Sequence, residues 1–227
     1  MSINVTKDYI QWDVESWSNL LPYWEHCVDW TKVQTALELG GRQGGLSLWL
    51  AKHGLDVVCS DLNDVEQSAS PLHSKHTFKG SINYQNIDAT NIPYENHFDI
   101  IIFKSILGGV GYNDQYDLQK KAFAEIHKAL KPGGILLFAE NLYASPLHNF
   151  MRKKFVKWGA YWRYITNSEL KECLTPFSSY EIKTTGFLAT FGRSEKQRYF
   201  LAKADKLLFN SISPNSWKYI GYGYARK

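Results

Sequence analysis

Two acidic residues and a run of glycines stand where a parallel sheet would bind a nucleotide. A short apolar run, Thr35–Leu39, carries Glu38 and leads into the glycine-rich turn at residues 40–45, GGRQGG. Glycines let the backbone approach a ligand closely, because no side chain intervenes. A second run rich in β-formers, Val57–Ser60, delivers Asp61, and ligands of open α/β sheets bind beyond the carboxyl ends of strands. We therefore expect a ligand between Gly40 and Asp61.

One strand–turn–helix–strand unit would position these groups. Leu46, Trp49 and Leu50 recur at helical spacing after the turn, and Gly54 is suited to end that helix in a left-handed conformation. A turn that merely joins a strand to a helix is the alternative.

The spacing of the glycines separates two cofactors. A nicotinamide fingerprint, G-x-G-x-x-G, read from Gly40 would need a glycine where Arg42 stands. The segment 38–44 instead matches acidic-x-G-x-G-x-G at the acid and at the first and third glycines, and there it resembles the first motif of the class I S-adenosylmethionine-dependent methyltransferases. Because Arg42 departs from that motif, its side chain must point away from the cofactor or reach the cofactor's carboxylate.

The resemblance implies a cofactor site for S-adenosylmethionine at the ends of several strands. Asp61 would accept hydrogen bonds from both ribose hydroxyls, and Glu38 would orient the glycine turn or the methionine amino group. Asp88 follows a strand predicted over Ile82–Ile87 and would lie beside the adenine; an Asx turn is its alternative. The cofactor residues that we predict are Glu38, Gly40, Gly41, Gly44, Asp61, Leu62, Asp88, Ala89 and Phe103.

The same resemblance implies the fold: α/β and Rossmann-like, with a mostly parallel seven-stranded sheet, an antiparallel last strand, and helices on both faces. The sequence Lys131-Pro-Gly-Gly, followed at once by the predicted strand Ile135–Glu140, is frequent in the family. A chain of 227 residues suits a single domain. Within it we expect a helical lid at 1–33, a cofactor-binding core at 34–140, and acceptor-side helices and final strands at 141–227, including a helix over Glu195–Asn210 with Leu207 and Leu208 inward.

Aromatic and basic residues outside the cofactor motifs are the candidates for the acceptor site. Met151, Phe155, Trp158 and Trp162 share one helical stripe, from which Arg152 projects elsewhere. Such a helix suits an anionic acceptor, or a peripheral membrane contact through 150–164; a plain amphipathic helix is the alternative. The substrate residues that we predict are Trp12, Lys104, Ser105, Trp162 and Tyr164, with docking of the N-terminal aromatics on the sheet as the alternative for Trp12.

Methyl transfer to a hydroxyl also needs a base. His148, expected in a loop, is the candidate, with Tyr112 as a second catalytic residue that helps to bind the acceptor. A structural or merely exposed histidine is the alternative. We expect no metal, because the three cysteines are widely spaced and nothing completes a ligand set around His73 and His76.

The composition and the motifs indicate which classes of binding partner to expect. A net charge of +4 forces no nucleic-acid partner, and the tetrapeptide with which base-directed methyltransferases hold an extruded base is missing after residue 103, so we expect no double-stranded nucleic acid. The N-terminus lacks a basic region followed by an apolar core, and no apolar run reaches the length of a membrane span. We expect a cytoplasmic protein without an integral membrane segment.

The function that we predict is transfer of a methyl group from S-adenosylmethionine to a small molecule or saccharide, at oxygen or nitrogen. The chain resembles methyltransferases of bacterial surface-polysaccharide biosynthesis. An NAD-dependent oxidoreductase is one alternative; it is opposed by Arg42 and by the poor placement of Tyr116 and Lys120 as a catalytic pair. A non-catalytic, methyltransferase-like partner protein is the other.

Overall fold

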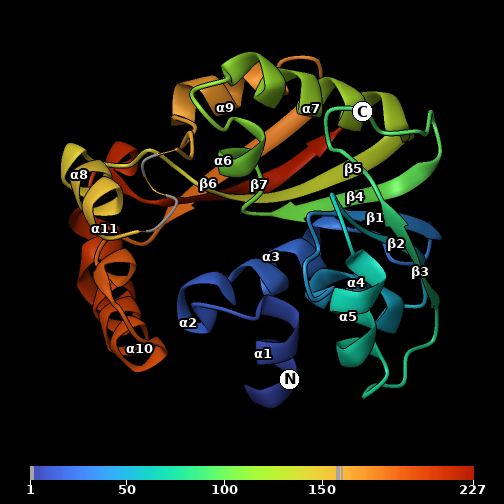
Figure 1. Ribbon diagram of the computed structural model, residues 1–227, viewed down its shortest axis with the longest axis horizontal. Helices are drawn as coiled ribbons and strands as arrows, with labels where there is room; N and C mark the ends of the chain where they lie inside the picture. The colour runs from blue at the N-terminus through green and yellow to red at the C-terminus, as the bar shows by residue number, and fades with distance from the viewer. Residues whose placement is uncertain (1–2, 157–158, 160) are drawn as a thin grey trace.

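A single sheet of seven strands forms the centre of the computed structural model, which describes residues 3–156, 159 and 161–227 (Figure 1). The strand order is β3-β2-β1-β4-β5-β7-β6, and β7 alone runs antiparallel to its neighbours. This confirms the predicted mostly parallel sheet with a reversed last strand. The strands are β1 (Thr35–Leu39), β2 (Asp56–Asp61), β3 (Ser81–Asn86), β4 (Phe98–Lys104), β5 (Leu130–Asn141), β6 (Ser179–Thr185) and β7 (Ile220–Arg226).

Helices cover both faces of the sheet, as predicted. In Figure 1, α7 and α9 lie above the sheet, whereas α3, α4 and α5 lie below it. The helices are α1 (Ile3–Ile10), α2 (Val14–Trp17), α3 (Leu20–Cys27), α4 (Gly45–Lys52), α5 (Val65–His73), α6 (Leu107–Val110), α7 (Tyr116–Ala129), α8 (Pro146–Phe155), α9 (Asn167–Leu174), α10 (Glu195–Ala204) and α11 (Asn210–Ile212), with short 3₁₀ or π turns η1 (Ala189–Phe191), η2 (Asp205–Phe209) and η3 (Asn215–Trp217). Within the described ranges, none of these helices has the length and apolarity to cross a bilayer.

The central strands are buried on both faces, which is why they appear as continuous apolar runs. Alternate residues of β4 enter different cores, because side chains alternate along a strand. Ile100 and Ile102 join the core that contains Trp49 of α4, whereas Ile101 and Phe103 join the core beneath α7. The aromatic ring of Phe103 is fully buried there, so only its backbone could contact a cofactor.

Several predicted boundaries are wrong for local physical reasons. The Lys131-Pro-Gly-Gly segment lies inside β5, where a register shift against β4 accommodates it and Gly133 has a φ of +78°. The predicted aromatic stripe does not reach Trp162, because α8 ends at Phe155 with an extended Val156; Trp158 lies outside the described residues.

The helix predicted over 195–210 is divided into α10, the π turn and α11. Leu207 and Leu208 point outward, with 85% and 51% of their surfaces exposed, and the buried residue of that turn is Asp205. Its carboxylate accepts hydrogen bonds from the backbone amides of Phe187, Leu188 and Ala189, so a polar side chain takes the inward position.

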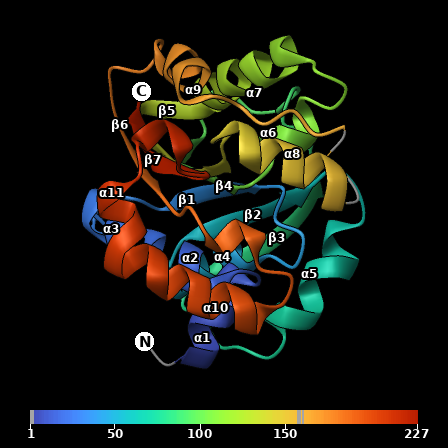
Figure 2. The same cartoon turned by 90° about the vertical axis from the view of Figure 1, so that its left-hand side faces the viewer.

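The N-terminal segment and α10 come together beside the carboxyl ends of the strands. The Asp13 amide donates to the Glu195 carboxylate, and Lys206 forms an ion pair with Glu15. Figure 2 looks toward the strand ends, with α6 and α8 above the sheet and α10 below it. The segments predicted as lid and acceptor side therefore flank the edge where the cofactor motifs end.

Candidate functional site

The glycine turn after β1 is shaped by the chain's own side chains. Gly40 and Gly44 have φ angles of +64° and +71°, which residues with a Cβ rarely adopt. A Cβ on Gly40 would lie 2.3 Å from Ile106 Cγ2, and one on Gly44 would lie 2.4 Å from His73 Nε2. Side chains of the protein itself thus pack closely against the glycines of this turn, and this packing holds the turn in one conformation.

Glu38, in β1, stabilises the segment that follows the glycine turn. Its buried carboxylate accepts hydrogen bonds from the Ser47 amide at 2.7 Å and the Leu46 amide at 3.3 Å, in the first turn of α4. Negative charge is favourable at this end of a helix, although burial raises the pKa of Glu38 to about 7. Glu38 therefore holds the first turn of α4, the helix that directly follows the glycine turn.

Asp61 lies against the glycine turn at the end of β2. The Gly41 amide donates to the Ser60 carbonyl at 2.8 Å, and the Arg42 amide donates to Asp61 Oδ2 at 2.9 Å. The Leu62 amide donates to Oδ1 at 2.7 Å. Each carboxylate oxygen has a second lone pair available for another donor, so Asp61 suits a pair of adjacent hydroxyls.

Arg42 contributes its backbone to this contact. Its φ of +50° is one that glycine, the residue in the resembled motif, adopts without strain. The Arg42 residue is exposed. The departure from the motif therefore keeps the backbone path and adds a side chain at the surface.

The predicted adenine side lies at the ends of β2 and β3. Asp88 is exposed, and its Oδ1 accepts from both the amide and the hydroxyl of Thr90 at 2.8 Å, which is the Asx turn considered as its alternative. Leu62 is 60% exposed beside Asp61, and Ala89 is half-buried. An apolar, exposed Leu62 next to a carboxylate with available lone pairs combines a surface for an adenine ring with an acceptor for ribose hydroxyls.

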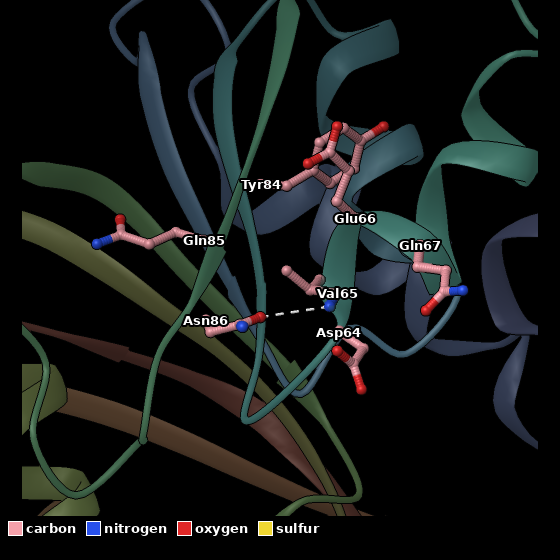
Figure 3. A pocket seen from close by; sticks show the side chains of 7 residues that line it. All are labelled: Asp64, Val65, Glu66, Gln67, Tyr84, Gln85 and Asn86. Atoms are coloured by element: carbon pink, nitrogen blue, oxygen red, sulfur yellow. Dashed lines mark hydrogen bonds between the residues drawn. The ribbon is translucent and has the colours of Figure 1, made fainter.

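A hollow of about 440 Å³ lies nearby, outside this set of residues. Figure 3 shows its lining, which comes from β3 and the start of α5. There Asn86 Oδ1 accepts from the Val65 amide at 3.3 Å. The lining residues are Asp64, Val65, Glu66, Gln67, Tyr84, Gln85 and Asn86, none of which we assigned to the cofactor.

Lys104, at the end of β4, is held beneath the N-terminal segment. Its Nζ donates to the Ile10 carbonyl at 3.0 Å and lies 3.7 Å from the ring centroid of Trp12 and 4.9 Å from that of Trp17. Burial lowers the pKa of Lys104 to about 7, and the nearby Asp13 partly opposes that shift. Two predicted substrate residues, Lys104 and Trp12, are thus in contact.

The other predicted substrate residues lie around α6 and α8. Ser105 accepts a hydrogen bond at Oγ from Asn141 Nδ2 at 2.6 Å. The Trp162 ring lies against Gly108, where a Cβ would be 2.6 Å from Trp162 Cε3. The Tyr164 ring lies 6.5 Å from that of Trp162, centroid to centroid.

The two predicted catalytic residues are not brought together. Tyr112 is 43% exposed and stacks on Tyr161. His148 lies on α8, not in a loop, and is fully buried. Its Nε2 faces the Phe187 carbonyl at 2.8 Å and must carry the proton, so Nδ1 accepts from the Ser145 hydroxyl at 2.6 Å. Both nitrogens are occupied, which contradicts a role as base. The sequence held a signal for this helix in the Ser145 cap followed by Pro146.

Two functional candidates were missed by the sequence analysis. Glu140, at the end of β5, is fully buried and accepts from the amides of Leu107 and Asn141 at 2.7 and 2.8 Å. Burial raises its pKa to about 7. Arg152 was expected to project away from the aromatic stripe, but its burial was not predicted; it donates from Nη1 to the Leu142 carbonyl at 2.6 Å. Apolar periodicity gave no signal for it, because the buried face of α8 is polar.

The paired histidines have structural partners. His73 Nδ1 lies 2.8 Å from the Tyr84 hydroxyl and Nε2 lies 2.8 Å from the Gly44 carbonyl. His76 Nε2 lies 3.0 Å from Asp8 Oδ2. Across the described part of the chain, no three or more His, Cys, Asp or Glu residues gather as metal ligands would.

Comparison with known sequences gives a family match within the segment predicted as the cofactor-binding core. Residues 37–138 match the family model described as a methyltransferase domain. Over 133 residues the chain is 30% identical to the ubiquinone/menaquinone biosynthesis C-methyltransferase UbiE of Psychromonas ingrahamii, which covers 56% of this chain and 49% of that protein. The chain thus spans about half the length of that relative.

Solved structures share the fold across nearly the whole chain. Phosphoethanolamine N-methyltransferase 2 of Haemonchus contortus, determined with phosphomonomethylethanolamine and S-adenosylhomocysteine, is 19% identical, with a TM-score of 0.63 over 93% of this chain and 52% of that one. A protein of Methanosarcina mazei described as an S-adenosylmethionine-dependent methyltransferase is 15% identical, with a TM-score of 0.60 over 91% and 97%. At these identities the likeness shows the fold.

The Asp61 geometry leads to a binding prediction. In Asp61→Asn an amide N–H must face one of the two backbone amides, and the charge is lost. Hydrogen bonds to charged groups contribute about 1.5–3 kcal/mol, so we expect the affinity for S-adenosylhomocysteine to fall roughly tenfold to a hundredfold in titration calorimetry. Asp56→Asn, at the exposed start of the same strand, is the matched control. Equal affinity of both variants would show that the ribose is held elsewhere.

Burial of Lys104 predicts a pH-dependent stability. The unfolded lysine keeps its proton to about pH 10.4, whereas the folded one loses it near pH 7. Between these values the unfolded state binds more protons, so stability rises with pH. Relative to Lys104→Met, the wild type should gain up to about 1.4 kcal/mol of unfolding free energy per pH unit from 7 to 9 in urea titrations. Exposed Lys153→Met is the control; a flat difference for Lys104→Met would contradict the shift.

Proposed function

We propose that this chain transfers a methyl group from S-adenosylmethionine to an oxygen or nitrogen of a small molecule or saccharide. The premise is the match of residues 37–138 to a methyltransferase domain, within the fold of the class I S-adenosylmethionine-dependent methyltransferases. The observation that carries the proposal is the contact of the Asp61 carboxylate with the Arg42 amide. It joins the acidic end of β2 to the glycine turn at the edge where such sheets bind ligands.

The cofactor would be held by residues from three strand ends. Asp61 would accept from the ribose, Leu62 and Ala89 would contact the adenine, and Asp88 would accept from its amino group through lone pairs that the Asx turn leaves available. Gly40, Gly41 and Gly44 would line the methionine side, with Glu38 fixing their conformation. S-adenosylmethionine supplies a methyl group on a sulfonium, already activated for transfer, so the protein's task is mainly placement.

Lys104 replaces His148 as our candidate for the base. An O–H or N–H acceptor releases a proton during transfer, and a base is most effective when its pKa lies near the working pH. Lys104 has a pKa lowered to about 7 and lies at a strand end next to Trp12. Such an amine could accept the proton that an O–H or N–H acceptor releases.

The remaining residues would form the enclosure of the acceptor. The lid at 1–33 would cover Lys104 through Ile10 and Trp12, and the core at 34–140 would bind the cofactor. Residues 141–227 would supply Asn141, which is hydrogen-bonded to Ser105, together with Trp162 and Tyr164. The names of the two relatives differ in the atom methylated, one C and one N, and both support a small molecule as acceptor. Tyr112 would bind the acceptor at the surface, beside Tyr161.

A peripheral membrane contact through 150–164 also belongs to this proposal, as does a cytoplasmic location. Phe150 and Phe155 are 60% and 48% exposed on α8, next to the exposed Lys153 and Lys154. Exposed aromatic and basic side chains on one helix suit the interface of an anionic bilayer.

A ligand comparison tests the proposed function. We expect S-adenosylhomocysteine to raise the melting temperature by several degrees, because a ligand that binds only the folded state stabilises it by RT ln(1 + [L]/Kd), where [L] is the free ligand concentration. NAD should leave it unchanged. A rise with NAD alone would identify an oxidoreductase, and no rise with either ligand would favour a non-catalytic partner protein; in both cases the proposal fails.

A further inference from the structure

The buried face of α8 carries two polar side chains whose donors lack acceptors. Arg152 is 6% exposed and Asn149 is 9% exposed. In the part of the chain that the structure describes, Arg152 Nη2 and Asn149 Nδ2 are buried and have no hydrogen-bond partner. Buried donors are almost always paired, so a pair of unpaired ones three residues apart on one helix points to a missing acceptor.

The charge of Arg152 is also poorly compensated. Its Nη1 donates to the Leu142 carbonyl, and its guanidinium carbon lies 4.2 Å from the ring centroid of Tyr164. Among the ion pairs found between described residues, none includes Arg152. Of the carboxyl groups, Glu140 interacts with it, but burial raises the pKa of Glu140 to about 7, so near neutral pH this group is partly protonated. A buried guanidinium without a full negative partner is strongly unfavourable.

This cluster adjoins the predicted acceptor side of the strand ends. Leu142, which accepts from Arg152, follows Asn141 at the end of β5, and Asn141 Nδ2 donates to Ser105 Oγ at 2.6 Å. Ser105 in turn follows Lys104 on β4. A short chain of contacts therefore joins the uncompensated charge to the residues that we assign to methyl transfer.

We propose that Arg152, together with Asn149, binds an oxyanion of the methyl acceptor, so that the acceptor is a hydroxyl or amino compound bearing a carboxylate or a phosphate. The inference rests on the proposed function and narrows its acceptor class. A guanidinium presents paired N–H donors that match the two oxygens of a carboxylate or phosphate. Asn149 adds a further donor, and the Tyr164 ring covers the guanidinium face. A neutral saccharide would leave the charge uncompensated.

Matched pairs of probes test this inference. Titration calorimetry of the full chain, saturated with S-adenosylhomocysteine, would use glycerol 3-phosphate against glycerol, and 4-hydroxybenzoate against 4-hydroxybenzyl alcohol. We expect at least one anionic member to bind at least tenfold more tightly than its neutral partner. Whether the phosphate or the carboxylate pair shows the preference identifies the oxyanion. If no anionic probe binds more tightly than its neutral partner, the inference is wrong.

Variants assign the preference to the cluster. Arg152→Gln should abolish it, Asn149→Leu should reduce it, and Lys153→Gln, on the exposed side of the same helix, should leave it intact. Arg152→Lys, which keeps the charge without the paired donors, should retain part of it and serves if Arg152→Gln does not fold. If Arg152→Gln folds and keeps the preference for the anionic probe, the inference is wrong. If Arg152→Gln does not fold, the inference is wrong when both Arg152→Lys and Asn149→Leu keep the preference at full strength.

The outcomes separate this inference from the proposed function. Binding of S-adenosylhomocysteine without any anion preference leaves the methyltransferase assignment in place and removes the oxyanion site. Anion binding that depends on Arg152, measured in a protein that does not bind S-adenosylhomocysteine, retains the oxyanion site and removes the assignment.

Discussion

The hydrogen bond from the Arg42 amide to the Asp61 carboxylate is the contact on which the site depends. It fixes the acidic end of β2 relative to the turn that follows β1, and the turn is itself held by packing on three sides. Ile106 packs against Gly40, His73 against Gly44, and Glu38 bonds the first turn of the helix beyond. A carboxylate in a fixed position with lone pairs available is what recognition of two adjacent hydroxyls requires. The residue whose amide makes this contact, Arg42, is not a glycine although its φ is left-handed. The path of the backbone at position 42 therefore matters more than the type of residue.

Ionisable groups with strongly shifted pKa values lie at one edge of the sheet, where Glu38 and Glu140 are buried and Lys104 is half-buried. Glu38, Lys104 and Glu140 end or nearly end β1, β4 and β5, and burial moves the pKa of each to about 7. Their linkage to stability has opposite signs: the raised pKa values of the two glutamates make stability fall as pH rises from about 4.3 to 7, whereas the lowered pKa of Lys104 makes it rise above 7. Strongly perturbed groups concentrate at functional sites, and these three surround the strand ends that the cofactor motifs occupy.

The sequence predicted the strands, and the residues at their ends, where the apolar pattern is consistent with only one type of element. A short apolar run identified β1, and a run rich in β-formers placed Asp61 at the carboxyl end of β2. Parallel strands of such sheets end at one edge, which is why the two ends could be expected to lie together. Prediction failed where the direction in which a side chain points had to be known. The sequence did not say which side of the sheet each residue of β4 faces, so Phe103 was grouped with the cofactor residues although its ring is buried in the core. Helical spacing grouped residues on α8 but did not reveal that its buried face is the polar one, with His148 and Arg152 inward. An apolar pattern also hid the outward Leu207, since a buried Asp205 takes the inner position by capping three backbone amides.

The most direct test of the account is a crystal structure of the protein with S-adenosylhomocysteine. We expect the ribose hydroxyls within hydrogen-bonding distance of the Asp61 carboxylate, the adenine between Leu62 and Asp88, and the sulfur directed toward Lys104. A ligand bound away from Asp61, or an Arg42 side chain folded into the crevice between Gly40 and Asp61, would contradict it.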